Sequence, residues 1–264
     1  MILLIHADKH PWATTRRAEA LKREWGDEVD IAYYKSLPDG DKYDTIHILF
    51  SGGIGKIKDY ILKYRHKVFT SLASQRTLDN FFDTDEDLIE IYKNTVCCVA
   101  FNPDLQDKLK KLIGQDNVVY IPNGVDEKLF NKKFVVGYAG VIDDHKGYGL
   151  VMQACEELGV EFKIAGFPYE RMPEFYREID CLVIPSMSEG CNNPTLEAMA
   201  MNIPVIATDT GIAKILGCVI VERDVESIKK AISKINSRSL ILENYTWSKI
   251  ANKYSQLYVE KQGA

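Results

Sequence analysis

The chain has 264 residues, which exceeds one typical domain and favours two domains of about 130 residues each. Hydrophobic residues make up 46% and charged residues 27%, as in an ordinary globular protein, and no apolar run is long enough to span a membrane. The net charge of −5 argues against a nucleic-acid-binding surface.

Short apolar runs alternate with amphipathic stretches along the whole chain. The runs of the first half are ILLIH (2–6), TIHILF (45–50), KVFTSL (67–72), TVCCVAF (95–101) and NVVYIP (117–122). The second half repeats the rhythm with FVVGYAG, EFKIAG, CLVIPS, PVIAT and CVIVE. Stretches such as TTRRAEALKREW and VESIKKAISKI separate the runs with helical periodicity. Continuous apolar strands separated by helices predict parallel sheets that are covered on both faces.

The two series of runs predict an α/β protein with two Rossmann-like domains. Their joint is expected in the turn-rich stretch 122–134, which gives an N-terminal domain at 1–130 and a C-terminal domain at 131–264. The chain closes in a helical stretch at 246–262, which can pack back on the N-terminal domain. Ligands of such sheets bind beyond the carboxyl ends of the strands, so functional residues are expected in the loops there.

The stretch FSGGIGKIK (50–58) predicts a strand, a glycine-rich loop and a helix start. It matches neither the dinucleotide-binding nor the P-loop pattern, so we interpret the loop as a tight turn, with a role in acceptor or phosphate approach as the alternative. The following residues, 55–67, have an apolar helical stripe surrounded by basic residues. This predicts a helix with a solvated basic face, or alternatively a surface for an anionic acceptor or for peripheral membrane contact.

The six cysteines form no C-x-x-C pair, and most lie in apolar runs. They are interpreted as core thiols of a reducing compartment, with a zinc site or a disulfide framework as the alternative. The apolar start of the chain is too short for a signal peptide. We therefore expect a cytoplasmic protein.

The segment PSMSEGCNNPTLEAMAM (185–201) carries two glutamates on either side of a small polar loop. Asn193 is the expected N-cap of a helix whose first residue is Pro194, with Glu197 in its first or second turn. A helix N-terminus favours an anion, and carboxylates accept hydrogen bonds from ribose or sugar hydroxyls, so the pattern suits a sugar nucleotide. Alternatively, Glu197 only stabilises the helix start and Glu189 is a solvated loop residue.

Four segments carry a resemblance to a known family. SEGCNNPTLEAMAMNIPVIATDTG resembles the E-x7-E segment of retaining glycosyltransferases with the GT-B fold, of the family 4 type. VVYIPNGVDEKLF is similar to the end of that family's first domain, FVVGYAGVIDDHKGYGLVMQA to the start of its second domain, and YTWSKIANKYSQLY to its closing helix. The resemblance covers roughly residues 95–260, whereas residues 1–94 share only the alternation of elements.

The resemblance implies an α/β fold of two Rossmann-like domains whose parallel sheets face a cleft. It also implies the transfer of a hexose from a UDP- or GDP-sugar to a hydroxyl of a glycan, a lipid-linked sugar or another acceptor, with retention of configuration. No metal or other cofactor is implied. The resemblance places the acceptor side in the N-terminal domain, 1–130, and the nucleotide-sugar donor side in the C-terminal domain, 131–264.

The resemblance also implies roles for individual residues. Glu197 would bind the ribose hydroxyls, Glu189 the donor sugar, and Lys146 would neutralise the diphosphate as the glycosidic bond breaks. Glu189 and Lys146 are thus the catalytic candidates. The other donor-binding candidates, mostly through backbone amides, are Gly140, Gly190, Cys191, Asn192, Asn193 and Thr195.

Two features depart from the family pattern. Val141 stands where the family commonly has an arginine, and the usual first-domain histidine has no counterpart. His6, His10 and Trp12 are the substitutes on the acceptor side, although structural roles for all three remain the alternative. Val141 also motivates a second hypothesis, a non-catalytic sugar-nucleotide or glycan-binding subunit of the same fold. A sugar-nucleotide epimerase is a third, disfavoured because the first domain offers no clear catalytic acids.

Overall fold

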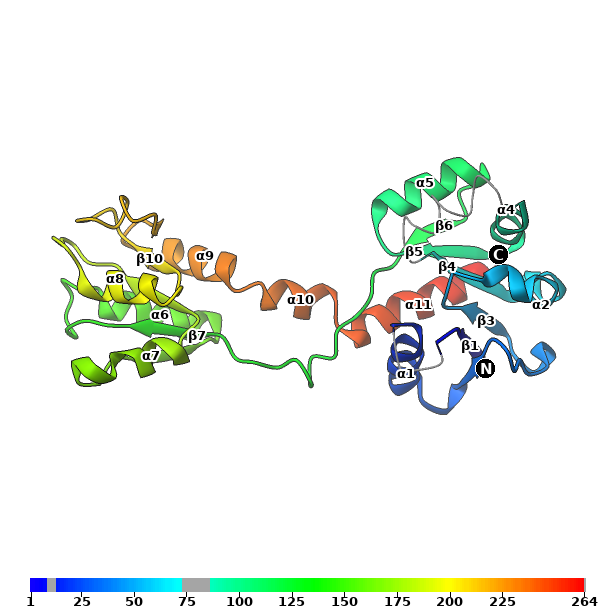
Figure 1. The fold of residues 1–264 in the computed structure, drawn as a ribbon, viewed down its shortest axis with the longest axis horizontal. Coiled ribbons are helices and arrows are strands. Elements are labelled where there is room, and N and C mark those ends of the chain that lie inside the picture. Colours follow the sequence, from blue (N-terminus) through cyan, green and yellow to red (C-terminus); the bar gives the residue numbers. More distant parts are fainter. Residues whose placement is uncertain (9–12, 73–85, 264) are drawn as a thin grey trace. The chain divides into compact units, whose positions relative to one another are not determined.

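The computed structural model describes residues 1–8, 13–72 and 86–263. The chain forms two compact units, Met1–Phe130 with Ile241–Ala264, and Asn131–Leu240 (Figure 1). The division near residue 131 follows the turn-rich stretch noted in the sequence. Residues 241–264 belong to the first unit instead of the second, because the last helix is buried against the first sheet.

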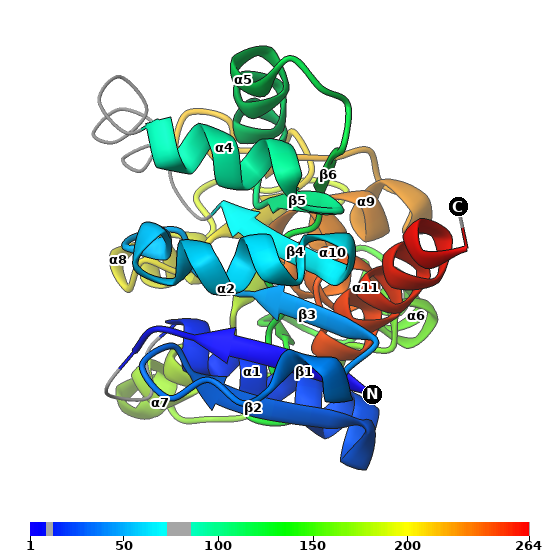
Figure 2. The same ribbon diagram turned by 90° about the vertical axis from the view of Figure 1, so that its right-hand side faces the viewer.

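The first unit is built on a six-stranded sheet in which every strand pair is parallel. The strand order is β2-β1-β3-β4-β5-β6, which Figure 2 shows from one side of the sheet to the other. The strands are β1 Ile2–His6, β2 Val29–Tyr33, β3 Thr45–Ile48, β4 Val68–Leu72, β5 Cys97–Ala100 and β6 Val118–Tyr120.

Helices cover both faces of this sheet. On one face lie α1 (Ala13–Trp25) and α11 (Trp247–Gln262), and on the other lie α2 (Lys58–Lys63), α4 (Glu86–Asn94) and α5 (Pro103–Ile113). Short 3-10 turns complete the unit at η1 Gly26–Glu28, η2 Gly40–Lys42, η3 Ile54–Ile57 and η4 Arg65–Lys67.

The prediction of a helix over residues 55–67 is wrong in the length of the helix. Only Lys58–Lys63 is α-helical, and 3-10 turns precede and follow it. Gly53 in the left-handed conformation (φ +80°) starts the first turn, and the backbone has left the helical region at Tyr64. The basic residues of 55–67 therefore do not form one continuous helical face.

The last helix, α11, begins with Thr246 as N-cap, whose side chain accepts a hydrogen bond from the amide of Lys249. Its buried stripe lies against the sheet and contains Ile250, Ala251, Tyr254, Leu257 and Tyr258. The Tyr258 hydroxyl lies 2.6 Å from Nδ1 of the fully buried His47 on β3. Apolar burial and this polar contact together hold the C-terminal segment in the first unit.

The second unit has a five-stranded parallel sheet in the order β11-β10-β9-β7-β8. Its strands are β7 Val135–Tyr138, β8 Glu161–Ile164, β9 Cys181–Ile184, β10 Val205–Ala207 and β11 Val219–Ile220. Helices α6 (Tyr148–Leu158) and α9 (Val225–Ile235) pack on one face, and α7 (Met172–Glu178) and α8 (Asn193–Ala200) on the other. The turn η5 (Tyr169–Arg171) precedes α7, and α10 (Arg238–Asn244) follows α9.

The two parallel sheets confirm the predicted α/β class with two Rossmann-like halves. Within residues 1–8, 13–72 and 86–263, none of the helices combines the length and the apolar character that crossing a membrane requires.

Candidate functional site

The strand order of the second sheet marks one position as the expected ligand site. From β7 the chain moves to β8 on one side, whereas β9, β10 and β11 follow on the other side. The loops after β7 and β9 therefore leave the sheet in opposite directions, at its topological switch point, which is where open α/β sheets bind ligands. These two loops carry Lys146 and Glu189.

Lys146 and Glu189 form an ion pair across the switch point. The Lys146 Nζ lies 2.6 Å from Glu189 Oε1, and the Ser186 hydroxyl donates to the same oxygen at 2.6 Å. The Lys146 side chain is 29% exposed and that of Glu189 is 12% exposed. Burial by itself raises the pKa of Glu189, but hydrogen bonds from Lys146, Ser186 and Asn192 outweigh it and hold the pKa below its ordinary value. Glu189 is therefore a carboxylate at neutral pH.

The loop that carries Lys146 is fixed by its own turn and by the end of β9. The amide of Lys146 donates to Asp143 Oδ1 at 2.7 Å, and the amide of Met187 donates to the carbonyl of His145 at 2.9 Å. Gly147 has φ +73°, and a Cβ there would lie 2.7 Å from the carbonyl oxygen of Pro185. Only glycine fits this close approach with a positive φ, which explains the Lys-Gly pair in the sequence.

Arg223 also holds this loop and was not singled out in the sequence. Its Nε donates to the carbonyl of Pro185 at 3.0 Å, and its Nη2 donates to the carbonyl of Asp144. Arg223 thus ties the loop of Lys146 to the end of β9. The available signal was its position directly after CVIVE, at the carboxyl end of a predicted strand, but no motif marks it. Val141, which the sequence analysis noted as a departure from the family pattern, is 66% exposed.

The helix after Glu189 begins one residue earlier than predicted. Asn192, and not Asn193, is the N-cap: its side-chain oxygen accepts from the amide of Thr195 at 3.1 Å. Helix α8 starts at Asn193, and Pro194 lies in the first turn, where its missing N–H costs no hydrogen bond. Thr195 is buried with its amide in the cap, so that amide is not free for a ligand.

The other backbone candidates remain near the switch point. Gly190 and Cys191 belong to the loop after β9, and Gly140 follows β7. Gly211, in the loop after β10, packs against this backbone: with φ +55°, a Cβ there would lie 2.1 Å from the carbonyl oxygen of Gly190. The loop after Glu189 is thus shaped by contact with a second loop that needs glycine.

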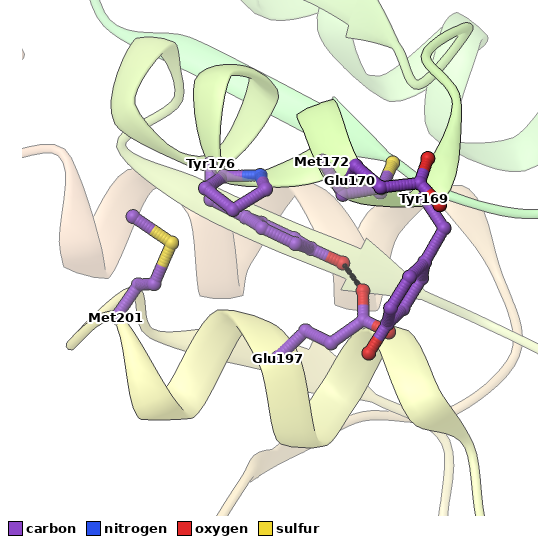
Figure 3. A pocket seen from close by; sticks show the side chains of 7 residues that line it. Tyr169, Glu170, Met172, Tyr176, Glu197 and Met201 are labelled. Atoms are coloured by element: carbon purple, nitrogen blue, oxygen red, sulfur yellow. Dashed lines mark hydrogen bonds between the residues drawn. The ribbon is translucent and has the colours of Figure 1, made fainter.

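Glu197 lies on the second turn of α8 and lines a pocket of about 300 Å³ (Figure 3). Its Oε2 accepts a hydrogen bond from the hydroxyl of Tyr176 at 2.8 Å. Burial, followed by the contact with Glu197, raises the pKa of Tyr176, so the hydroxyl stays protonated and donates. The other residues that line the pocket are Tyr169, Glu170, Met172, Pro173 and Met201.

The pocket combines apolar walls with one oriented carboxylate. Tyr169 is 73% exposed, and Figure 3 shows its side chain reaching toward Glu197 across the pocket. A flat, partly apolar group with neighbouring hydroxyls matches this lining, because an aromatic ring offers a stacking face and a carboxylate accepts hydrogen bonds from hydroxyls.

The acceptor-side candidates lie in the first unit or outside the described residues. His6, at the end of β1, has Nδ1 3.0 Å from the Thr15 hydroxyl, and its ring packs beside Tyr33. His10 and Trp12 are outside the described residues. All six cysteines are free, and only Cys191 is exposed. Among the residues that the structure describes, no cluster of His, Cys, Asp and Glu is arranged to hold a metal ion.

Comparisons with known proteins found one family and several similar proteins. The family described as glycosyl transferases group 1 matches residues 133–237. The matched residues lie within the second unit, which also holds Lys146, Glu189 and Glu197. An uncharacterized glycosyltransferase of Methanocaldococcus jannaschii is 22% identical over 234 residues, covering 72% of this chain and 59% of the relative. The capsular polysaccharide biosynthesis glycosyltransferase CapM of Staphylococcus aureus is 26% identical over 167 residues, covering 48% of this chain and 44% of CapM.

Among solved structures, Anabaena HepE, in complex with UDP and glucose, aligns with a TM-score of 0.46 and 13% identity. The alignment covers 97% of this chain and 98% of HepE. The chain spans 59% and 44% of the lengths of the two curated relatives.

Proposed function

We propose that the chain transfers a sugar from a nucleotide diphosphate sugar to an acceptor hydroxyl with retention of anomeric configuration. One observation carries the proposal: the Lys146–Glu189 pair lies at the switch point of the second sheet, and the same loop and helix lead to the pocket of Glu197. A cation, a sugar-binding carboxylate and a nucleoside-sized pocket are the parts that such a donor requires.

In this proposal the nucleoside occupies the pocket of about 300 Å³ beside Tyr169. Glu197, oriented by Tyr176, accepts hydrogen bonds from the ribose hydroxyls. The backbone amides of Gly190, Cys191 and Asn193 face the diphosphate and sugar from the helix N-terminus, where the macrodipole favours negative charge.

Lys146 and Glu189 then act on the reacting end of the donor. A diphosphate competes with Glu189 for the Lys146 ammonium, because both are anions in reach of the same cation. Once Lys146 binds the diphosphate, it stabilises the charge that grows on the leaving group as the glycosidic bond breaks. Glu189 is left to accept hydrogen bonds from the sugar hydroxyls. The departing diphosphate accepts the proton of the attacking hydroxyl, so no separate general base is required.

The test is release of nucleoside diphosphate from UDP- and GDP-sugars with a panel of acceptors. Lys146→Ala should lower kcat at least about tenfold, because it removes a charge contact made in the transition state. Lys230→Ala, a lysine of α9 outside the site, is the matched control and should keep wild-type turnover. Wild-type kcat in a folded Lys146→Ala protein would refute the assigned role.

The second candidate function is a non-catalytic subunit that binds a sugar nucleotide or a glycan. Val141 in place of the family's arginine favours it. A thermal-shift screen identifies the ligand under either function, since a ligand at 100 times its dissociation constant adds about 2.7 kcal/mol of stability whether or not it turns over. Consumption of that ligand with acceptors then separates the two functions. A stabilising sugar nucleotide that is never consumed with any acceptor would support the binding subunit.

A further inference from the structure

A second polar cavity, of about 570 Å³, lies in the first unit. It is lined by residues that follow two strands: Tyr34, Lys35 and Leu37 after β2, and residues 55–60 after β3. In the sheet, β2 and β3 flank β1, and all three strands run parallel. From β1 the chain moves to β2 on one side, whereas β4, β5 and β6 continue from β3 on the other. The cavity therefore lies at the carboxyl edge beside the first sheet's own switch point, where α/β sheets bind ligands.

Two lysines in this cavity have no counter-ion within residues 1–8, 13–72 and 86–263. The Lys58 ammonium lies 2.6 Å from Glu90 Oε2 and is compensated. Lys35 and Lys56 are exposed, and neither makes an ion pair with the residues that the structure describes. Asp59 is the single acidic residue in the lining. The cavity thus presents two lysines from two separate segments that the described part of the chain leaves unpaired.

Two other basic residues of 55–67, Lys63 and Lys67, contact groups of the first unit itself. Lys67 Nζ donates to the carbonyl of Tyr43 at 2.8 Å, and Lys63 Nζ lies 4.5 Å from the centre of the Tyr64 ring. Lys63, Arg65 and Lys67 lie outside the lining of the cavity, whose lysines are Lys35, Lys56 and the paired Lys58.

The rest of the lining suits a ligand that is larger than a simple ion. Tyr60 is fixed by a hydrogen bond from its hydroxyl to the carbonyl of Pro38 at 3.1 Å, and burial raises its pKa so that the hydroxyl stays protonated. Tyr34 lies beside Lys35, whose Nζ is 5.8 Å from the ring centre. A Cβ on Gly55 would meet nothing within 4 Å, so the backbone there is open to close approach.

We propose that this cavity binds a phosphate-bearing ligand, with Lys35 and Lys56 on the phosphate oxygens and Tyr34 and Tyr60 against its remainder. Two lysine ammonium groups from two separate segments suit a tetrahedral phosphate, which offers oxygens on several sides. The assignment of this cavity as an acceptor site rests on the function proposed above. Under that assignment, the cavity selects an acceptor that carries phosphate. Binding of phosphate itself does not depend on that function.

The test is calorimetric titration of the full chain with inorganic pyrophosphate. The Lys35→Gln/Lys56→Gln double variant should bind roughly threefold to tenfold more weakly, as expected for the loss of two solvent-accessible ion pairs. The matched control is Lys93→Gln/Lys111→Gln, which removes the same charge from α4 and α5 of the same unit. If both double variants lose pyrophosphate affinity equally, the effect is due to the net charge of the protein, and the proposal is wrong.

Lys146→Ala separates this proposal from the donor site. If pyrophosphate affinity falls with Lys146→Ala and not with Lys35→Gln/Lys56→Gln, the anion binds only in the second unit and the inference is wrong. If it falls only with Lys35→Gln/Lys56→Gln, the inference stands even if no sugar nucleotide is bound or consumed.

A vesicle-binding experiment distinguishes a lipid headgroup from a soluble ligand as the source of the phosphate. Co-sedimentation with vesicles containing phosphatidic acid, but not with phosphatidylcholine alone, and its loss in Lys35→Gln/Lys56→Gln would assign the cavity to a lipid-borne phosphate. Pyrophosphate binding without vesicle binding would assign it to a soluble phosphorylated ligand. Absence of both pyrophosphate and vesicle binding in the wild-type chain would overturn the proposal.

Discussion

The ion pair between Lys146 and Glu189 should contribute measurably to the stability of the second unit. Exposed pairs contribute about 0.2–1 kcal/mol, whereas breaking a fully buried pair costs about 3–5 kcal/mol. Here the side chains are 29% and 12% exposed, the contact is 2.6 Å, and Ser186 adds a second hydrogen bond to the carboxylate. We therefore expect a coupling free energy of about 1–2 kcal/mol from a double-mutant cycle of Lys146→Ala and Glu189→Gln.

The assay is urea unfolding followed by far-UV circular dichroism. Trp25 and Trp247 lie in the first unit, and the sequence of the second unit, 131–240, contains no tryptophan, so tryptophan fluorescence does not report on the second unit. The Lys146→Ala and Glu189→Gln variants should shift the urea midpoint of the dichroism transition. They should leave the midpoint of the tryptophan fluorescence transition unchanged. A saturating nucleoside diphosphate should reduce the coupling, because it takes over the Lys146 ammonium from Glu189.

The pH dependence gives an independent check on this pair. The folded state holds the pKa of Glu189 below its ordinary value of 4.5, so the contribution is complete above pH 4.5 and is lost as the pH falls through the lowered value. A coupling below about 0.3 kcal/mol at pH 7, which is within the usual additivity error, would refute the reasoning. So would a coupling that does not change between pH 7 and strongly acidic conditions.

Three further predictions follow from single contacts. Tyr176→Phe removes the hydrogen bond that orients Glu197 and should weaken nucleoside diphosphate binding about two- to tenfold by calorimetry; unchanged affinity would contradict that role. Arg223→Ala should free the loop of Lys146 and lower kcat about tenfold, with only partial rescue by lysine, which cannot bridge both carbonyls; wild-type kcat would count against it. Burial lowers the pKa of His47 from 6.5 to about 3, so stability should be complete above pH 6.5 and fall below it by up to about 1.4 kcal/mol per pH unit. His47→Gln should flatten this slope in urea unfolding followed by tryptophan fluorescence, and equal slopes would refute the assignment.

Local pattern was sufficient for the fold class. The apolar runs at 2–6, 67–72 and 95–101 correspond to β1, β4 and β5, because strands buried on both faces need uninterrupted apolar sequence. The strand β2 was not among the predicted runs. It lies at the edge of the sheet, where partial exposure allows Asp30 to interrupt the apolar pattern.

Element ends were less predictable, because they depend on which of several competing side chains makes a contact. Asn192 and Asn193 are equally good N-caps by residue type, and the structure selects Asn192 through its bond to Thr195. The periodicity of 55–67 suggests one helix, but the left-handed Gly53 and the turn at Tyr64 restrict α-helix to Lys58–Lys63.

The sequence by itself determined the two series of parallel strands, the loops that carry Lys146 and Glu189, and the helix that carries Glu197. These features follow from residue types and periods that act over a few positions. Only the tertiary structure decided which of these residues meet. The strand order joins the loop of Lys146 to that of Glu189, and packing of α7 beside α8 brings Tyr176 to Glu197. The tertiary structure also places Arg223, which follows β11, at the end of β9, and it places Lys35 in the same cavity as Lys56. Such contacts join residues far apart in the chain, and the order in which strands pair leaves no local trace in the sequence.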